Sequence, residues 1–226
     1  MKTVNATPAQ DERELAEEIA RVLRDGGLAC LPCSGRYRIV ADLTNEAAVL
    51  ALAQSKGRVR EAPALVFVDS EKMLETVSAA IDPGVVRLAK AIWPQSLTIR
   101  VVPRPELPAR ILRQLGGRKS RVGVRIPEDA LVRATVSALG RPLYVSSANR
   151  EHKAGDSSPA QIRKTFGNSV QIFVDRGDLA PGPASTIVDI VDGKLVFARV
   201  GAVRTDTVEA VFAQQGGVHE AGVHEG

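Results

Sequence analysis

Cationic and small polar residues recur in this sequence where predicted helices and strands end. Five short segments share this character: Lys56-Gly57-Arg58, Val122 to Pro127, Ser146 to Asn149, Ser185-Thr186 and Arg199-Val200-Gly201. Ammonium and guanidinium groups neutralise phosphates and carboxylates, while hydroxyl and amide groups donate hydrogen bonds to them. Because ligands bind in the crevice at strand ends in α/β folds, the set predicts a site for a phosphate or ribose. The local alternative is that the cations offset a helix dipole and the Ser and Asn residues make turns.

A second basic feature is the segment from Arg100 to Arg125, which has one acid, Glu106. Such a local field favours phosphates, whereas the net charge of the whole chain is only +4. We expect a surface connection between two strands, with RNA as one possible ligand and a solvated loop as the plain alternative. The eight basic residues are Arg100, Arg104, Arg110, Arg113, Arg118, Lys119, Arg121 and Arg125.

Familiar catalytic motifs are absent from the sequence. No GxxxxGK[ST], GxGxxG, HExxH or GxSxG pattern occurs, and His152 is the one histidine outside the C-terminal tail. Classical P-loop, dinucleotide-binding, zinc-protease and serine-hydrolase chemistry is therefore excluded. The cations and small hydrogen-bond donors described above remain as the candidates for a functional site.

The two cysteines form the pair Cys30-Leu31-Pro32-Cys33. A CxxC pair can be redox-active when a helix N-terminus stabilises one thiolate, but no amphipathic helix opens after Cys33. One CxxC also supplies only two of the four ligands that a structural zinc site needs, so no metal site is predicted. We expect Cys30 in the core of a strand and Cys33 in the loop after it.

The elements that must position these residues alternate between helices and strands. This alternation predicts an α/β fold with a twisted mixed sheet flanked by helices, and the turn at Asp192-Gly193 predicts a late antiparallel hairpin. Helical patterns cover Asp11 to Asp25, Glu46 to Ser55, Glu71 to Ala79, Val85 to Ile92, Asp129 to Leu139 and Pro159 to Phe166. Strand patterns cover Gly27 to Leu31, Ala64 to Val68, Leu97 to Val102, Val122 to Ile126, Pro142 to Val145, Val170 to Val174, Thr186 to Ile190 and Leu195 to Ala198.

Composition and length place the chain among ordinary globular proteins. It has 226 residues, of which 44% are apolar and 25% charged. We expect one domain over residues 7–203, followed over 204–226 by a C-terminal helix and a flexible tail rich in Gly, His and Glu. No apolar run is long enough for a membrane span or a secretion signal, so we expect a cytoplasmic protein with no membrane partner.

Six motifs, in this order along the chain, resemble the YrdC-like family of threonylcarbamoyl-AMP synthases. The resemblance extends over roughly Leu15 to Val203. The motifs are Lys56-Gly57-Arg58, Trp93-Pro94-Gln95-Ser96-Leu97-Thr98, Val122-Gly123-Val124-Arg125-Ile126-Pro127, Ser147-Ala148-Asn149, Ser185-Thr186-Ile187-Val188-Asp189 and Arg199-Val200-Gly201.

This resemblance implies a fold, an activity and a site. The implied sheet has a concave, positively charged face. The implied enzyme joins threonine, bicarbonate and ATP into threonylcarbamoyl-AMP with release of pyrophosphate, for tRNA modification, and some members bind double-stranded RNA. ATP would arrive with Mg²⁺. By resemblance, the ATP side comprises Lys56, Arg58, Ser147, Asn149 and Arg199, with Lys56 and Arg58 as the catalytic candidates, and the substrate side comprises Tyr37, Arg125 and Ser185.

The largest departure from the family pattern lies between Pro32 and Ile39. The family's Pro-Thr-Asp-Thr-x-Tyr-Gly-Leu is reduced here to Pro32 and Tyr37. Most other departures also fall on the threonine side, which indicates a diverged member near the YciO branch with a rebuilt amino-acid pocket. Three hypotheses follow: a threonylcarbamoyl-AMP synthase, a non-catalytic double-stranded RNA-binding paralogue, or a carbamoyl-adenylate enzyme with a different acceptor.

Overall fold

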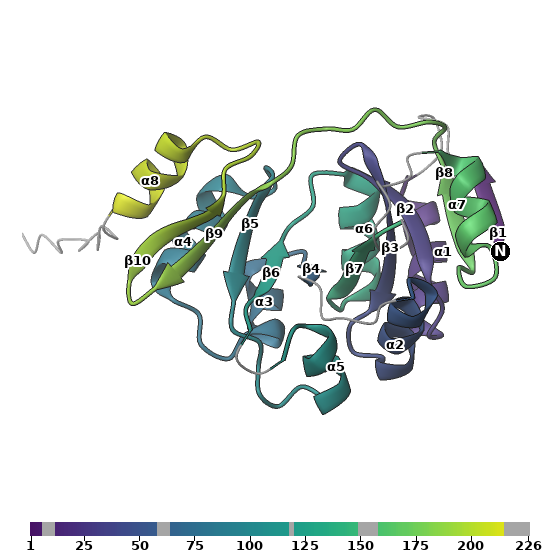
Figure 1. Ribbon diagram of the computed structural model, residues 1–226, viewed down its shortest axis with the longest axis horizontal. Coiled ribbons are helices and arrows are strands. Elements are labelled where there is room, and N and C mark those ends of the chain that lie inside the picture. The colour runs from purple at the N-terminus through teal and green to yellow at the C-terminus, as the bar shows by residue number, and fades with distance from the viewer. Residues whose placement is uncertain (6–11, 58–63, 118–119, 149–157, 215–226) are drawn as a thin grey trace, which may run out of the picture.

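The computed structural model describes residues 1–5, 12–57, 64–117, 120–148 and 158–214, and its strands form one sheet (Figure 1). Across the sheet the order is β1-β8-β2-β3-β7-β4-β6-β5-β9-β10. The strands are β1 (Lys2–Asn5), β2 (Ala29–Cys33), β3 (Arg36–Asp42), β4 (Leu65–Phe67), β5 (Leu97–Val101), β6 (Val122–Arg125), β7 (Leu143–Ser147), β8 (Ile172–Asp175), β9 (Thr186–Val191) and β10 (Lys194–Arg199).

Helices flank the sheet. The longest, α1, has 13 residues, and no helix of the described chain is long and apolar enough to cross a bilayer. The helices are α1 (Glu12–Arg24), α2 (Glu46–Ser55), α3 (Glu71–Val77), α4 (Pro83–Ile92), α5 (Ala109–Gln114), α6 (Ala130–Leu139), α7 (Pro159–Phe166) and α8 (Thr205–Ala213).

Parallel and antiparallel pairs mix within the sheet, which confirms the predicted mixed α/β class. β1 and β2 pair parallel with β8, and β4 and β5 pair parallel with β6 and β9, whereas the remaining pairs are antiparallel. The predicted late hairpin is β9–β10. Asp192 (φ 50°) and Gly193 (φ 69°) supply its turn, because both are left-handed and so match the twist of the strands.

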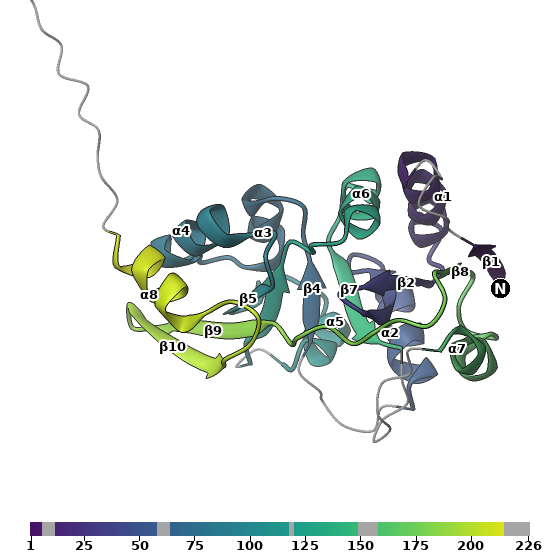
Figure 2. The same ribbon diagram turned by 90° about the horizontal axis from the view of Figure 1, so that it is seen from above.

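Two apolar clusters hold the helices to the sheet. α1 and α6 lie together on one side and bury Leu15, Ile19 and Leu131 in one cluster, while α2, α5 and α7 lie on the other side (Figure 2). The second cluster contains residues from those three helices and from α3, α4 and α8. Strand alternation connects the clusters, since Ile39 belongs to one and its neighbour Val40 to the other.

Side-chain caps fix where several helices begin. The Asn45 Oδ1 accepts a hydrogen bond from the Ala48 N–H at 3.1 Å, and Ser70 Oγ accepts one from Met73 N–H at 3.2 Å. Asp82 Oδ1 accepts one from the Gly84 N–H at 2.7 Å, next to the helix's first residue, Pro83. These caps satisfy N–H groups that would otherwise lack partners.

The hairpin β2–β3 corrects the expectation for Cys33. The sequence predicted a loop from Cys33 onward, but Cys33 is the buried last residue of β2, and residues 36–42 form β3. Ser34 (φ 52°) and Gly35 (φ 69°) make a tight turn between the two strands. Tyr37 and Ile39 are buried. Because Arg36 and Arg38 alternate with them, the sequence of this strand resembles that of a solvated loop.

Residues 176–185 form a strap that joins β8 to β9 across the sheet (Figure 1). Six strands lie between β8 and β9, which makes seven spacings of about 4.8 Å, or roughly 34 Å across a flat sheet. The eleven Cα steps from Asp175 to Thr186 reach at most about 40 Å. The strap must therefore run nearly extended.

The strap rests directly on the β2–β3 turn. A Cβ added at Gly35 would lie 2.2 Å from the Ala180 carbonyl oxygen and 2.5 Å from the Gly182 nitrogen. The start of the strap is bonded to Tyr37, whose hydroxyl donates to the Gly177 carbonyl at 2.8 Å and accepts from the Arg176 N–H at 3.0 Å. Glycine at position 35 thus permits the close crossing.

We expect Gly35→Ala to lower the free energy of unfolding by about 2–4 kcal/mol, because it combines left-handed strain with a backbone collision. Gly193→Ala is the matched control: Gly193 has the same φ of 69° but nothing within 4 Å of its added Cβ. Its cost should be about 1–2 kcal/mol. Urea unfolding measures both changes in the free energy of unfolding. Equal losses of stability in the two variants would show that the strap does not restrict the side chain at position 35.

Candidate functional site

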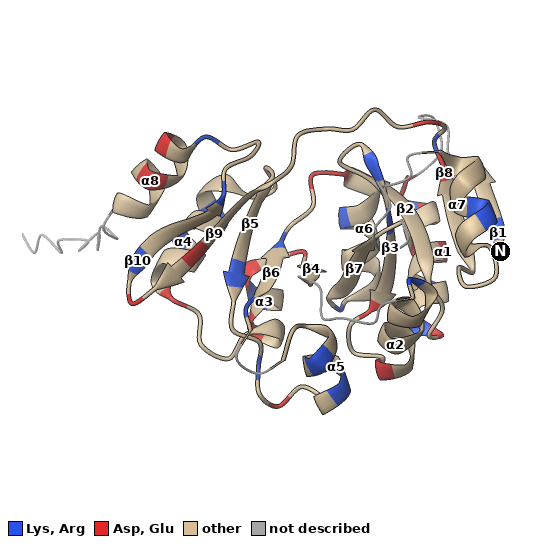
Figure 3. Cartoon of the chain, viewed as in Figure 1, with Lys and Arg blue, Asp and Glu red and all other residues tan. Residues whose placement is uncertain are grey.

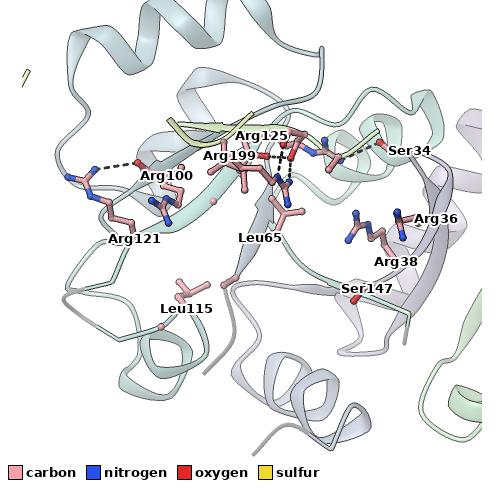
Figure 4. A pocket seen from close by; sticks show the side chains of 18 of the residues that line it. Ser34, Arg36, Arg38, Leu65, Arg100, Leu115, Arg121, Arg125, Ser147 and Arg199 are labelled. Carbon is pink, nitrogen blue, oxygen red and sulfur yellow. Dashed lines mark hydrogen bonds between the residues drawn. The ribbon is translucent and has the colours of Figure 1, made fainter. Parts of the chain in front are cut away.

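The strap, the β2–β3 hairpin and strands β5, β6, β9 and β10 line a cavity of about 880 Å³ (Figure 4). This volume lies in the range of small-molecule and cofactor sites. Its wall includes polar residues, such as Ser34 and Thr98, and apolar residues, such as Leu65 and Ile187. The cavity therefore offers both hydrogen-bond donors and apolar surface to a ligand.

Six arginines line this cavity, and no described Asp or Glu does. Arg36 and Arg38 lie on one side and Arg100 and Arg121 on the other (Figure 4). Arg100 has a counter-charge, because its Nε donates to Asp189 Oδ1 at 2.9 Å. Within the described chain the other five have no carboxylate within 4 Å. The arrangement favours anions. The six are Arg36, Arg38, Arg100, Arg121, Arg125 and Arg199.

Arg125 is the last residue of β6, within the strand predicted over Val122 to Ile126, and it is buried. Only 3% of its surface is accessible, and its guanidinium stacks 5.2 Å from the Phe67 ring centroid. It donates to Ser96 Oγ at 3.1 Å and Ser34 Oγ at 3.3 Å, while its buried Nε has no partner among the described residues. Arg125 is thus a fixed cation with donor capacity to spare.

Ser185 and Arg199 meet at the junction of the strap and β10. Arg199 Nε donates to the Ser185 carbonyl and its terminal nitrogen to Ser185 Oγ, both at 3.0 Å, and Thr98 Oγ1 lies 3.0 Å from the same Oγ. Gly201 allows this approach, because an added Cβ would lie 2.2 Å from the Ala184 carbonyl oxygen. Two segments predicted separately therefore form one corner of the cavity.

Lys56 and Ser147 are also brought together. Lys56 caps the end of α2 and is 5% exposed, and its Nζ donates to the Ser147 carbonyl at 2.6 Å and to Ser147 Oγ at 3.1 Å. Ser147 lines the cavity at the end of β7. The predicted partners Arg58 and Asn149 lie outside the described residues.

Tyr37 lines the cavity, but its hydroxyl is committed to the strap. It is 1% exposed and packs 5.2 Å from Phe173 between ring centroids. Burial raises the pKa of the Tyr37 phenol. The position predicted to contact substrate thus also holds the strap to β3.

Arg36 and Arg38 are site residues that the sequence reading did not select. They lie two apart on β3 and therefore on one face, and both reach the cavity. Burial lowers the pKa of Arg38, and the nearby charges of Arg125, Arg36 and Arg199 lower it further, against the opposing effect of Cys33. The sequence signal that could have identified them is their alternation with the apolar residues Tyr37 and Ile39, which is typical of a strand.

The arginine-rich segment divides into parts with different environments. Arg100, Arg121 and Arg125 line the cavity, whereas Arg118 and Lys119 lie outside the described residues. The connection is not one surface loop, because α5 interrupts it and buries Ile111 and Leu112. Figure 3 shows basic positions on both α5 and β5.

Acids accompany two of the remaining arginines. Arg104 lies 3.4 Å from Glu106, and Arg110 lies 3.4 Å from Glu46. Arg113 is exposed on α5. These exposed ion pairs reduce the phosphate-binding field that the sequence count suggested.

Cys30 and Cys33 point to opposite faces of β2. Cys30 belongs to the cluster that contains Tyr37, and Cys33 belongs to the cluster of α1 and α6. Residues three apart on a strand cannot bring their side chains together on one face, so the redox-pair alternative is wrong for this fold. Burial also raises the pKa of both thiols.

Fold and cavity define a class: an α/β protein with a cationic cavity built from strand ends. The family model described as telomere recombination, which covers Sua5, YciO and YrdC, matches residues 21–201. The chain belongs to this Sua5/YciO/YrdC family, which confirms the resemblance carried by the six motifs.

Relatives and solved structures agree with this assignment. The threonylcarbamoyl-AMP synthase of Thiobacillus denitrificans is 30% identical over 78% of this chain and 91% of its own length. That of Pyrococcus abyssi is 28% identical over 86% of this chain, which spans only 56% of that relative.

Two solved structures share the fold. P. abyssi Sua5 complexed with L-threonine matches with a TM-score of 0.81 and 25% identity, over 94% of this chain and 61% of that one. E. coli YciO matches with a TM-score of 0.75 over 90% of this chain and 97% of that one. At 22% identity, the YciO match concerns the fold alone.

We expect both thiols to be unreactive toward Ellman's reagent in the folded protein at pH 7 to 8, because the attacking species is the thiolate and burial disfavours it. Unfolding in guanidinium should release two thiols per chain. Rapid reaction of either cysteine in native buffer, or an internal disulfide found by mass spectrometry, would contradict the strand placement.

Proposed function

We propose that the protein forms a carbamoyl adenylate from ATP, bicarbonate and an amine, in the manner of threonylcarbamoyl-AMP synthases. The observation that carries the proposal is the cavity with six arginines and no described acid, whose lining includes Thr98, Arg125, Ser147, Ser185 and Arg199 of the family motifs. Relatives named for this activity at about 30% identity support it.

The product named in those relatives dictates the chemistry. The amine nitrogen attacks the bicarbonate carbon, water leaves, and a carbamate forms. A carbamate oxygen then attacks the α-phosphorus of ATP, and the bond to the β-phosphate bridging oxygen breaks to release pyrophosphate. Every reactant except the amino group is anionic, so fixed cations can gather them and stabilise the charge that develops on the phosphate oxygens.

Roles for individual residues follow from their places: Ser147, Arg199, Arg125 and Ser185 line the cavity, and Lys56 is hydrogen-bonded to Ser147. We assign Lys56, Ser147 and Arg199 to the nucleotide, together with Arg58 and Asn149 by resemblance. ATP would bring Mg²⁺ as part of the substrate. Arg125 and Ser185 are assigned to the carboxylate of the amine substrate, because Arg125 is buried and retains an unpaired donor. Tyr37 supports the wall behind them.

The enzyme is favoured over a non-catalytic double-stranded RNA module. A duplex needs a row of unpaired cations on an accessible surface. In the described part of the arginine-rich segment, Arg104 and Arg110 have acidic neighbours. Arg100, Arg121 and Arg125 line the cavity. This distribution suits a small anionic ligand.

The test is pyrophosphate release measured with ATP, bicarbonate and an amine, each omitted in turn. We expect Lys56→Ala and Arg199→Gln to weaken ATP binding by about 10- to 150-fold, since each removes a charged hydrogen bond of about 1.5–3 kcal/mol. Arg113→Gln, on the exposed face of α5, is the control and should match wild type. Pyrophosphate release that does not depend on bicarbonate, or unaltered ATP affinity in both variants, would refute the proposal.

A further inference from the structure

Four of the six arginines that line the cavity, Arg36, Arg38, Arg100 and Arg121, have no ligand group assigned to them so far. Arg100 and Arg121 lie on one side, and Arg36 and Arg38 lie on the opposite side (Figure 4). Arg125 lies between these walls in the close view. Because cations occur at both ends, the bound anionic groups must also be distributed between both ends.

Arg38 is the least satisfied of these cations. Its Nε is buried and has no hydrogen-bond partner among the described residues, and no described carboxylate lies within 4 Å of its guanidinium. The backbone of Arg38 lies within the sheet, where it pairs with Leu31 of β2 on one side and Ser147 of β7 on the other. A buried donor without a partner is costly unless a ligand supplies the acceptor.

Arg36 reinforces Arg38. It lies two residues earlier on the same face of β3, is exposed, and also reaches the cavity. The two guanidinium groups therefore present a pair of planar donors from a rigid hairpin, which is the arrangement that binds a carboxylate or phosphate through several hydrogen bonds. Like charges held together in this way repel each other until an anion binds.

Arg36 and Arg38, here called the β3 pair, are distinct from the residues already assigned to the nucleotide and to the substrate carboxylate. Lys56 and Arg199 are bonded to Ser147 and Ser185, and Arg125 is bonded to Ser34 and Ser96. Arg36 and Arg38 have no such hydrogen bond to another described residue. Their donors are thus available to a separate anionic group.

The geometry points to an amine substrate that carries a second negative group, a carboxylate or a phosphate, bound by Arg36 and Arg38. This inference rests on the proposed function and narrows its substrate class. Acidic amino acids and O-phosphorylated amino acids have this chemistry, whereas the side chain of threonine carries a neutral hydroxyl. A neutral side chain would leave the two arginines without an anionic partner when the substrate is bound.

The experiment compares kcat/KM for pyrophosphate release among threonine, aspartate, glutamate, O-phosphoserine and O-phosphothreonine at saturating ATP and bicarbonate. We expect at least one dianionic amine to exceed threonine by tenfold or more. The carboxylate and phosphate arms identify which group is bound. If threonine equals or exceeds every dianionic amine, the inference is wrong.

Variants locate the recognition. Arg38→Gln and Arg36→Gln should each lower the preference for the dianionic amine over threonine by about tenfold, with little change in the KM for ATP. Arg38→Lys, which keeps the charge, should retain more of the preference than Arg38→Gln, and exposed Arg36 provides a second variant if Arg38→Gln fails to fold. Arg113→Gln is again the control. A loss of ATP affinity that is equal for all amines would assign the β3 pair to the nucleotide and overturn the inference.

Calorimetry separates this inference from the proposed function. The same amines are titrated into wild type and Arg36→Gln in the presence of ATP. Binding of a dianionic amine that depends on Arg36, without any pyrophosphate release, would support the substrate class and refute the reaction. Pyrophosphate release with neutral amines only would support the reaction and refute the substrate class.

Discussion

The crossing of the strap over the β2–β3 turn is the constraint on which the site depends. The strap spans six strands with little spare length, so its height above the sheet is set where it meets Gly35. Its far end places Ser185 against Arg199, and its near end receives the Tyr37 hydroxyl. One steric contact between two backbones thus positions both walls of the cavity.

The electrostatics of the cavity follow from this framework. Arg100 is paired with the carboxylate of Asp189, but two other cavity arginines contact neutral groups: Arg125 lies against the Phe67 ring and donates to two serines, and Arg121 Nη1 lies 3.5 Å from the Arg100 carbonyl oxygen. Neutral partners fix the geometry of a cation without cancelling its charge. The attraction for an anionic ligand is therefore retained.

Much of the fold could be predicted, because periodicity, caps and turns are local signals. The helix over 46–55 and the hairpin at Asp192-Gly193 are examples. β3 was harder to recognise, because Arg36 and Arg38 alternate with its buried residues. Arginines that line a cavity look the same in the sequence as arginines that face solvent. The meeting of Ser185 with Arg199, or of Lys56 with Ser147, depends on strand order, which no local pattern contains. α5 was missed because six residues with two arginines give little periodic signal.

The parallel pairing of β1 with β8 has a consequence for synthesis of the chain on the ribosome. Lys2 is in register with Ile172, so β1 cannot pair with β8 until about 170 further residues have been made. β2 meets β3 within a few residues and can pair early. Contacts of such high sequence separation form late in folding, so β1 joins the sheet only after β8 has been made, well after the β2–β3 hairpin can form.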